Sequence, residues 1–418
     1  MRLFIPVAAV LMVVALSAGP VSAQDGRKPA AQYLVSVSTD NLAVPGMPAG
    51  EGGLGGMIAS LVTGGVGGGA QRTLWLDLLG PETPAEPKAE HQIPPGLKMG
   101  GSLPLLTPAP VRSERVESQP AEEHERQDTR ILFYWGCGEA IGPGQPKVLD
   151  TAKMSTADFS QIPVARQGSS VVRLSPRQGW TYGEWPNRET RVQVPGDGSL
   201  QGEHLIKGNY APEINFSLNE RQDFMAPVVF TRTEGSLADA MRLEWRSVPN
   251  ATGYFMMATG GSGDAREVVM WNSSERQEMG GGLMNYVAPG TVQKYVKEKV
   301  VLPPDATTCT IPKGIFKSAE GAMLMFIAYG PEANFAQPPK PADPKAPWNP
   351  VWTAKVRFKS SGMLPLGMET SDAGAAPGED KPTSGQKAEG ETQPEGGAPS
   401  PMKDVMDGAK KLKGIFGF

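Results

Sequence analysis

The residue types that most often hold metals or act as nucleophiles are few in this sequence and lie far apart. The histidines are His91, His124 and His204, and the cysteines are Cys137 and Cys309. Zinc sites in proteins take pairs of such ligands from positions only a few residues apart. No pair in this sequence has that spacing, so we predict no metal site and no catalytic thiol.

A glycine motif invites a nucleotide-binding interpretation. It occupies residues 136–142 (GCGEAIG) and directly follows a predicted strand at residues 129–135. Dinucleotide-binding loops need a helix that begins at the glycines and points its N-terminus at the pyrophosphate. Pro143 and Pro146 would end such a helix within its first turns. We therefore predict no nucleotide cofactor, and we expect the glycines to let the backbone turn sharply after the strand.

Acidic residues do not point to one reaction either. The chain has 44 Asp and Glu residues, so two carboxylates that lie close together carry little information. Glycoside hydrolysis needs two carboxyl groups at a defined separation across a cleft, which a sequence does not reveal. The Gly-x-Ser-x-Gly pattern of hydrolase nucleophiles is absent. We assign no catalytic residue, and a hydrolase of unknown substrate stays as an alternative.

One short stretch carries side chains suited to sugar binding. Its members are Trp180, Tyr182, Glu184 and Trp185. Rings in a loop would offer a flat platform for sugar rings, and the carboxylate would bond hydroxyl groups. The same rings would otherwise cover the open end of a small β-domain, as large amphipathic side chains often do. Glycan or cell-wall binding at residues 180–187 is therefore an alternative function.

Residues 1–23 have the pattern of a secretory leader. Arg2 provides the positive charge, residues 3–16 the apolar segment and residues 21–23 (VSA) the cleavage site. We expect a periplasmic or secreted protein, either soluble or peripheral to a membrane. Cys137 and Cys309 would then lie in an oxidising compartment, where a disulfide between them and two buried thiols are both compatible with the sequence.

Composition limits the fold and excludes one class of partner. Gly (51) and Pro (40) make up more than a fifth of the 418 residues, and hydrophobic residues make up 39%. These values predict long loops and some unfolded chain beside the folded part. The net charge of −4 at pH 7 does not provide the basic surface that nucleic-acid binding needs, so we predict no nucleic-acid partner.

The elements that would position all these residues are strands. Short apolar segments rich in β-branched and aromatic residues predict strands at 33–37, 72–79, 129–135, 169–174, 190–194 and 200–218, with clear alternation at 72–79. A turn signal within residues 241–259 separates two further strands, which we expect to be an antiparallel pair. We predict an all-β protein of two β-domains. The N-terminal domain, residues 24–222, would carry a long Gly-rich loop between its first two strands.

An ordered series of apolar motifs occupies residues 223–360. It reads LEW, NATGY, VVMWNSS, CTIP, AMLMFIAYGPE and VWTAKVRF. In this order the motifs resemble a fibronectin type III or related immunoglobulin-like β-sandwich. The resemblance implies that Trp245 is the buried aromatic of strand B, that Tyr254 opens strand C, and that residues 323–329 form strand F. Residues 280–304 depart from the pattern as an insertion, with a short helix expected at 291–300.

The chain changes in composition after residue 360. Residues 361–401 lose nearly all aromatic and β-branched residues, which predicts a disordered linker. In residues 402–418 apolar residues recur at helical spacing, and acidic residues precede basic ones, as a helix dipole favours. This amphipathic helix would dock on a membrane surface or a partner, or fold back on its own domain. Its contact residues would be Met402, Val405, Met406, Lys410, Lys411, Leu412 and Phe416.

These observations together favour a scaffold or binding role over a catalytic one. We predict an exported, non-catalytic scaffold or interaction protein of the cell envelope, placed in the periplasm, with two β-domains. Its tethered terminal helix would meet a membrane surface or a partner protein.

Overall fold

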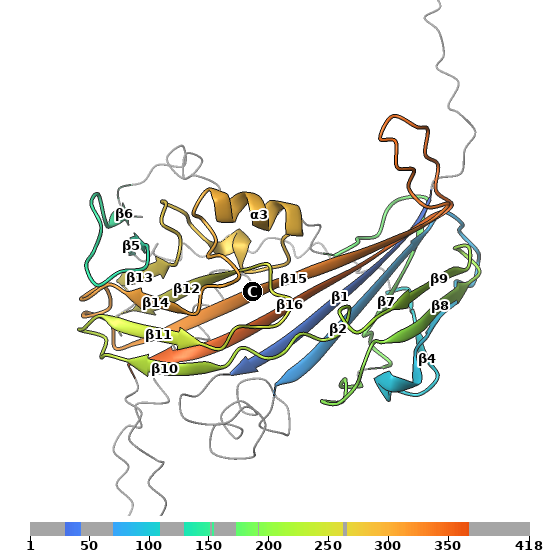
Figure 1. Ribbon diagram of the computed structural model, residues 1–418. Coiled ribbons are helices and arrows are strands. Elements are labelled where there is room, and N and C mark those ends of the chain that lie inside the picture. The colour runs from blue at the N-terminus through green and yellow to red at the C-terminus, as the bar shows by residue number, and fades with distance from the viewer. Residues whose placement is uncertain are drawn as a thin grey trace, which may run out of the picture.

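The computed structural model describes residues 30–42, 70–108, 129–150, 153, 173–190, 192–261 and 266–367. These residues are mostly β-strand, in three sheets with one α-helix (Figure 1). The all-β class predicted from the sequence is confirmed at this level. The leader, the Gly-rich loop, most of the linker and the terminal segment 402–418 lie outside the described residues.

A nine-stranded sheet forms the centre of the fold, and strands from both ends of the described chain meet in it. Its order is β6-β5-β13-β12-β15-β16-β1-β2-β7. β1 (Ala31–Leu42) lies between β2 (Gln71–Gly80), to which it is antiparallel, and β16 (Trp352–Leu366), to which it is parallel. The remaining members are β5 (Arg130–Trp135), β6 (Lys147–Asp150), β7 (Thr181–Trp185), β12 (Gly253–Gly261), β13 (Glu267–Asn272) and β15 (Gly321–Gln337).

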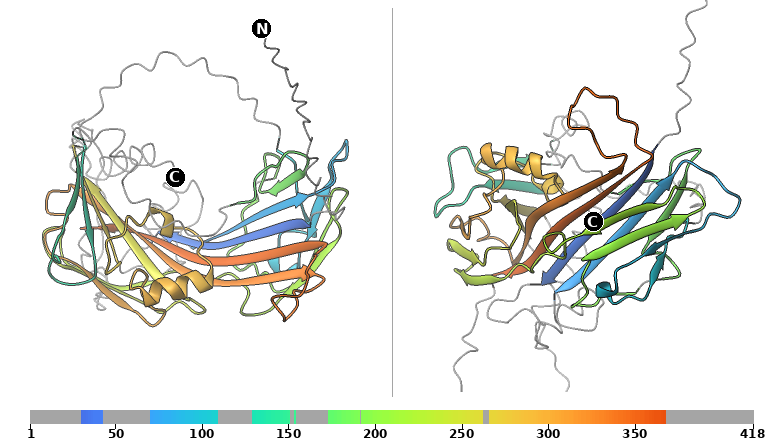
Figure 2. Two further views of the ribbon diagram at one scale, coloured as in Figure 1. Left: turned by 90° about the horizontal axis from the view of Figure 1, so that it is seen from above. Right: turned by 45° about the vertical axis from the view of Figure 1, so that its right-hand side comes forward.

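Two smaller sheets pack on one face of the central sheet, at opposite ends (Figures 1 and 2). The first contains β10 (Phe230–Glu234), β11 (Met241–Trp245) and β14 (Thr308–Ile311). The second contains β3 (Ala89–Gln92), β4 (Ser102–Pro104), β8 (Gly202–Gly208) and β9 (Ile214–Leu218), with the 3-10 helix η1 (Pro95–Leu97) beside it. Even-numbered residues of β16, from Trp352 to Leu366, are buried in a core that includes both smaller sheets, so the two sheets share a face.

Aromatic contacts identify the two ends of this core. At one end Trp245 of β11 packs against Tyr254 and Phe326, with ring centroids 5.8 and 5.2 Å away. At the other end Phe216 of β9 stacks on Phe335 of β15 at 4.9 Å. A bulge in β15 shifts its alternation, so Phe326 and Phe335 face the same core although one has an even number and the other an odd number.

The opposite face of the central sheet is covered at one end by α3 (Pro289–Lys297) and the 3-10 helix η2 (Gly281–Leu283). α3 begins with proline at its first position, and Val292 and Tyr295, about one turn apart, are its buried residues. They belong to a second core together with residues of β12, β13 and β15. The helix expected at residues 291–300 is therefore present, shifted towards the N-terminus. Of the described helices, none combines the length and the apolar character needed to cross a membrane.

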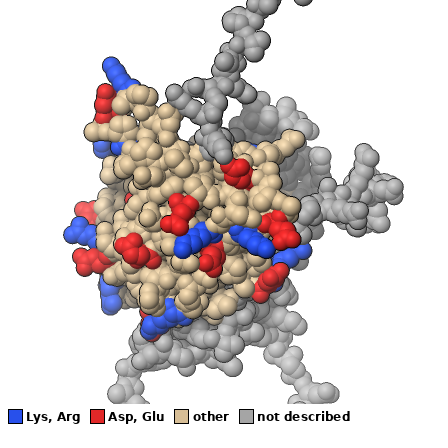
Figure 3. Space-filling view, turned by 90° about the vertical axis from the view of Figure 1, so that its right-hand side faces the viewer, with Lys and Arg blue, Asp and Glu red and all other residues tan. Residues whose placement is uncertain are grey.

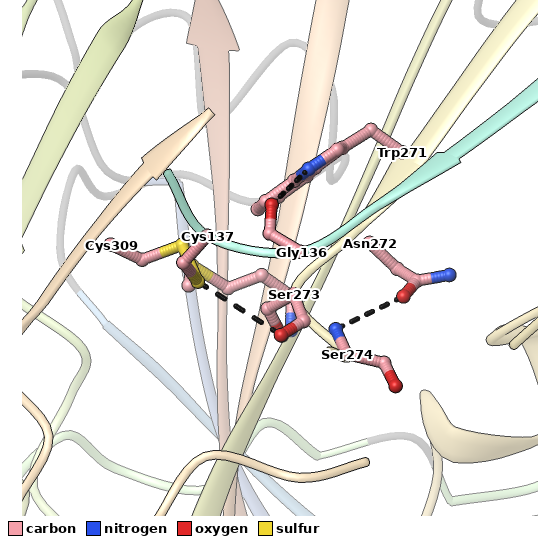
Figure 4. Close-up of a disulfide and its surroundings, with 8 residues drawn as sticks. Gly136, Cys137, Trp271, Asn272, Ser273, Ser274 and Cys309 are labelled. Carbon is pink, nitrogen blue, oxygen red and sulfur yellow. Dashed lines mark hydrogen bonds between the residues drawn. A yellow bond between two sulfur atoms is a disulfide. The ribbon is translucent and has the colours of Figure 1, made fainter. Parts of the chain in front are cut away.

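A disulfide joins the layers at the α3 end of the molecule. Gly136, at φ +98°, turns the chain after β5, as the glycine motif predicted. Cys137 then reaches Cys309 of β14, with an S–S distance of 2.10 Å (Figure 4). The Trp271 indole N–H donates to the Gly136 carbonyl oxygen at 2.9 Å and fixes the turn. The central sheet and the three-stranded sheet are thus covalently linked.

A buried chain of hydrogen bonds crosses the other end, between the central and four-stranded sheets. The Nε2 of His204 lies 2.7 Å from the Leu200 carbonyl oxygen, which only accepts, so this nitrogen carries the hydrogen. His204 Nδ1 then accepts from His91 Nε2 at 2.9 Å, and His91 Nδ1 accepts from the Tyr33 hydroxyl at 2.8 Å. These roles are those of two neutral rings, which burial favours by lowering the pKa of both histidines.

The strands are distributed differently from the sequence prediction. β11 and β12, predicted as a pair within residues 241–259, lie in different sheets, because the turn between them carries the chain from one layer to the other. Alternation shows which face of a strand is buried, but it does not identify the neighbouring strand. The central sheet contains strands from both sides of residue 222, so the predicted domains 24–222 and 223–360 share one sheet.

One strand boundary and two short predicted strands also differ from the structure. β16 continues to Leu366, into the segment assigned to the linker. Of residues 169–174, the described residues 173 and 174 are not in a strand. Of the described residues 190 and 192–194, only Val194 takes part in β-structure, as an isolated bridge to Arg72. Short runs of β-branched residues form strands only when a partner strand lies beside them.

Candidate functional site

The helix α3 covers only part of its face of the central sheet (Figure 1). Polar side chains occupy the strands next to it on that face. On β16 the odd-numbered residues Lys355, Arg357 and Lys359 lie on this face. The register places Arg357 beside Ser36 and Lys359 beside Ser38 of β1. Burying charged groups at the middle of a sheet costs folding free energy, so this row suggests a site rather than packing alone.

A cleft of about 200 Å³ lies over these strands. We call it the Tyr286 cleft, after one of the aromatic rings that line it. Its lining residues come from β1, β2, β16 and the segments before α3 and β7, and they are Ser36, Ser38, Asp40, Thr73, Trp75, Arg173, Asn285, Tyr286 and Lys359.

Tyr286 holds two cations over its ring. The Cζ atom of Arg357 lies 4.2 Å from the ring centroid, and the Nζ atom of Lys359 lies 5.0 Å from it. Arg357 is only 2% exposed, and its Nε donates to the Ser36 hydroxyl oxygen at 2.9 Å. Burial raises the pKa of Tyr286, which keeps the ring neutral and suited to cation–π contacts.

Lys359 is the cation of the cleft whose charge is least compensated by its surroundings. Burial lowers the pKa of its ammonium group, nearby Arg357 lowers it further, and Asp40 acts in the opposite direction. Among the described residues, no carboxylate oxygen lies within 4.0 Å of its Nζ atom. The amine is therefore partly desolvated without a paired anion.

Asp40 is the only carboxylate among the described residues that line the cleft. Its oxygens accept hydrogen bonds from the Ser38 hydroxyl at 2.6 Å and from the Thr73 hydroxyl at 3.1 Å. The Ser361 hydroxyl donates to it as well. These three donors satisfy much of the hydrogen-bonding capacity of the carboxylate.

A buried ion cluster supports the far wall of the cleft, beyond Trp75. Asp77, which has no exposed surface, accepts from Arg173 Nη2 at 2.5 Å and from the Tyr182 hydroxyl at 2.8 Å. Glu184 accepts from the same two groups at 3.1 and 3.0 Å. The Arg173 guanidinium also lies over the Trp75 ring, 4.5 Å from its centroid. Arginine and tyrosine thus hold both carboxylates together.

The residues predicted to bind sugar do not form an exposed platform, which corrects that prediction. Residues 181–185 are strand β7 rather than a loop, so their side chains alternate between the two faces. Trp185 is 2% exposed in the main core, while Tyr182 and Glu184 belong to the ion cluster. Trp180 is half-buried, with Arg177 over its ring at 4.9 Å. These rings are buried because β7 pairs with β2 as part of the central sheet.

Sequence reasoning missed the cleft, although part of its signal was present. Lys355, Arg357 and Lys359 alternate with Val356 and Phe358, a spacing that places three cations on one face of a strand. Such a row on a central strand is unusual and could have been noticed. Trp75 and Tyr286 gave no comparable signal, because the fold brings them together from distant segments.

A second cavity of about 860 Å³ adjoins the Tyr286 cleft. Leu174 and Ala288 line it, next in the chain to Arg173 and close to Tyr286 of the cleft. Trp348, Trp352 and the amide side chains of Gln32 and Asn334 also line it. Its volume is in the range of about 300–1,000 Å³ that is typical of ligand sites.

The surface seen in Figure 3 carries acidic and basic side chains close to one another, without a broad area of one sign. Among the described residues, no cluster of three or more His, Cys, Asp or Glu side chains has a geometry suited to a metal ion. No family model, curated protein or solved structure matches the chain. The functional argument therefore rests on the cleft and its surroundings.

Proposed function

We propose that this chain is an exported, non-catalytic interaction protein of the cell envelope, whose β framework presents the Tyr286 cleft to a partner. The observation that carries the proposal is the cleft itself. Cations, hydroxyl groups and two aromatic walls gather over strands β16, β1 and β2 of the central sheet, where packing alone would favour apolar residues. A binding role explains why the fold keeps a costly half-buried charge such as Lys359.

Export is supported by two independent features. Residues 1–23 have the composition of a secretory leader. The bond between Cys137 and Cys309 is of the kind that forms and persists in oxidising compartments such as the periplasm.

Kinship to fibronectin type III-like sandwiches is part of the proposal. Strands β10 to β16 number seven, and the pairings among them are all antiparallel, with three strands facing four. Trp245 and Tyr254, the expected aromatics of strands B and C, are 2% and 0% exposed. This arrangement supports the resemblance. Fold kinship supports a scaffold role by analogy, whereas the cleft supports it directly.

The terminal segment would localise the protein. Residues 368–401 would act as a tether, and the helix of residues 402–418 would dock on a membrane surface or a partner protein. Deleting residues 402–418 should release the protein from the membrane fraction or abolish one partner interaction. Unchanged fractionation and unchanged partners would remove this part of the proposal.

Site-specific photo-crosslinking tests the role of the cleft. A photo-reactive phenylalanine analogue at Trp75, which is 36% exposed at the cleft, should capture a partner in cells that produce the protein naturally. The same analogue at Val148, which is 44% exposed on the edge strand β6, is the matched control. An adduct at position 75 alone would support the proposal. A folded protein that gives no adduct at position 75 would overturn it.

Glycan binding is the second candidate function, now at the larger cavity rather than at residues 180–187. Trp348 lines that cavity with its indole N–H donating to the Pro338 carbonyl oxygen at 3.0 Å, and amide side chains lie nearby. An aromatic ring next to amide groups suits the apolar face and the hydroxyl groups of a sugar. Cell-wall pull-down that survives Trp348→Ala would exclude this site.

A further inference from the structure

The Tyr286 cleft has more hydrogen-bond donors than acceptors available to a ligand. Asp40 already accepts from three hydroxyl groups. Among the described contacts of Arg173, the partners bond its Nε and Nη2 atoms, which leaves the Nη1 donors for a ligand. The Ser36 hydroxyl accepts from Arg357 and keeps its own hydrogen. This balance favours a ligand group that accepts hydrogen bonds.

Lys359 strengthens this preference, and Lys355 on the same face of β16 provides the comparison. Lys355 has an anion within the fold, because its Nζ atom lies 3.2 Å from a carboxylate oxygen of Glu332. Lys359 has only the face of the Tyr286 ring as a described partner. A half-buried ammonium beside a cavity, without a carboxylate in contact, offers its charge to an incoming anion.

The dimensions of the cleft limit what enters it. A volume of about 200 Å³ accommodates a small group and is below the range of about 300–1,000 Å³ for complete ligands. The adjoining cavity of about 860 Å³ can hold the rest of a larger molecule. A charged end group in the cleft and a larger remainder in the cavity fit this pair of spaces.

We propose that the Tyr286 cleft binds an oxyanion group, a carboxylate or a phosphate, at the end of a larger ligand. Lys359 and Arg173 would contact the oxygens, Ser36 would donate a hydrogen bond, and Trp75 and Tyr286 would exclude water on either side. The inference deepens the proposed function, because it names the chemistry that a partner must present to the cleft.

Titration of the full mature chain with small anions tests this inference. The probes are inorganic phosphate and D-glucuronate, with D-glucose as the uncharged control and sodium chloride at matched ionic strength. Calorimetry should detect binding of phosphate, of D-glucuronate or of both, and no binding of D-glucose. Lys359→Met should weaken that binding by about tenfold or more, the value expected for losing one charge-assisted hydrogen bond. Lys355→Met removes an equal charge from the same strand face, at a residue that lines the adjoining cavity, and it should change the affinity for phosphate, which fills only the cleft, less than about twofold.

The outcomes separate the two anion sources and the two proposals. Binding of phosphate alone identifies a phosphate group, and binding of D-glucuronate alone identifies a carboxylate. No binding above the chloride control, or equal affinity in Lys359→Met, would overturn the inference. A crosslink at position 75 together with no anion binding would overturn this inference and leave the proposed function intact. Anion binding without any crosslink at position 75 would support this inference and overturn the proposed partner-binding function.

Discussion

The two ends of the central sheet are held together by different chemistry. At the α3 end, Trp245, Tyr254 and Phe326 pack edge to face, and the bond between Cys137 and Cys309 joins the layers. At the β7 end, the layers meet through the buried Tyr33–His91–His204 chain, and the outer face carries the Asp77 ion cluster. We call these the apolar end and the polar end.

This difference shows which end of the fold depends on buried polar and ionic contacts rather than on apolar packing. Apolar contacts and a disulfide depend little on pH or on a ligand. Buried histidines, paired carboxylates and a half-buried lysine depend on both. The cleft lies at the polar end, so the part of the molecule that is easiest to perturb is also the part that we propose to bind a partner. The following predictions test this comparison, in order of expected effect.

Removing the disulfide should have the largest effect and should act on the apolar end. The bond closes a loop with a sequence separation of 172 residues, and the chain-entropy model assigns roughly 5 kcal/mol to a loop of that length. The variant with both Cys137→Ser and Cys309→Ser should lose up to this amount of unfolding free energy in guanidinium titrations. Reductant should destabilise the natural chain and leave the variant unchanged, and equal sensitivity of both would refute the assignment.

Breaking the ion cluster should destabilise the polar end. Asp77→Ala removes a fully buried carboxylate and leaves Arg173 and Tyr182 without their main acceptor, at a cost of about 3 kcal/mol. Glu184→Gln, whose side chain is 24% exposed, is the matched control and should cost about 1 kcal/mol. Hydrogen exchange should show faster opening of β2 and β7 and unchanged β10 and β11. Faster exchange at both ends would argue against separate ends.

Acidification should also act on the polar end alone. Burial lowers the pKa of His91 and of His204 below the ordinary value of 6.5, and the hydrogen bond to the Leu200 carbonyl and the charge of Glu203 partly offset this for His204. The stability that the neutral rings provide is therefore complete above pH 6.5 and is lost as pH falls through the lowered folded-state pKa. Between about pH 7.5 and about pH 5.5 the loss should be up to about 1.4 kcal/mol for His91, whose pKa is lowered well below the ordinary value, and smaller for His204. Urea titrations of the natural chain and of the variant with His91→Gln and His204→Gln would measure it, since the variant should lack this dependence.

Replacing the cleft lysine should have the smallest effect on stability, and in the opposite direction. The pKa of Lys359 is lowered by burial, so its charged form is disfavoured in the folded state at neutral pH. Lys359→Met should leave the unfolding free energy unchanged or raise it by less than about 1 kcal/mol. A clear loss in thermal or urea unfolding would mean that the charge supports the fold, and that the cleft has a structural role.

The class of fold could be predicted from the sequence because alternation is local. Residues 72–79 alternate, residues 33–37 and 129–135 are short runs rich in β-branched and aromatic residues, and each of the three is found as a strand. The pairing of strands is not local. Nothing near residue 31 or residue 352 indicates that these segments lie side by side, and β5 and β13 meet in the same way. Domain boundaries drawn by composition therefore cut through one sheet.

The candidate site was predictable to a smaller degree. The three cations of β16 follow from spacing alone, but their partner ring, Tyr286, comes from an insertion that departs from the sandwich pattern. The aromatic segment 180–185 reads as a loop from its composition, but its residues 181–185 pair with β2 as a strand and are largely buried. Composition does not reveal such a pairing. A side chain becomes part of a site through neighbours that are distant in sequence, and one sequence shows few of them.

The position of β1 has a consequence for how the protein is made. Ala31, at its start, pairs with Trp352, near the end of the described chain, so the middle of the sheet stays open until β16 has been synthesised. During synthesis β1 therefore waits for a partner that is made more than 300 residues later, and the pairing is of the long-range kind that forms slowly. The order of the strands thus makes closure of the sheet a late event in the life of the growing chain.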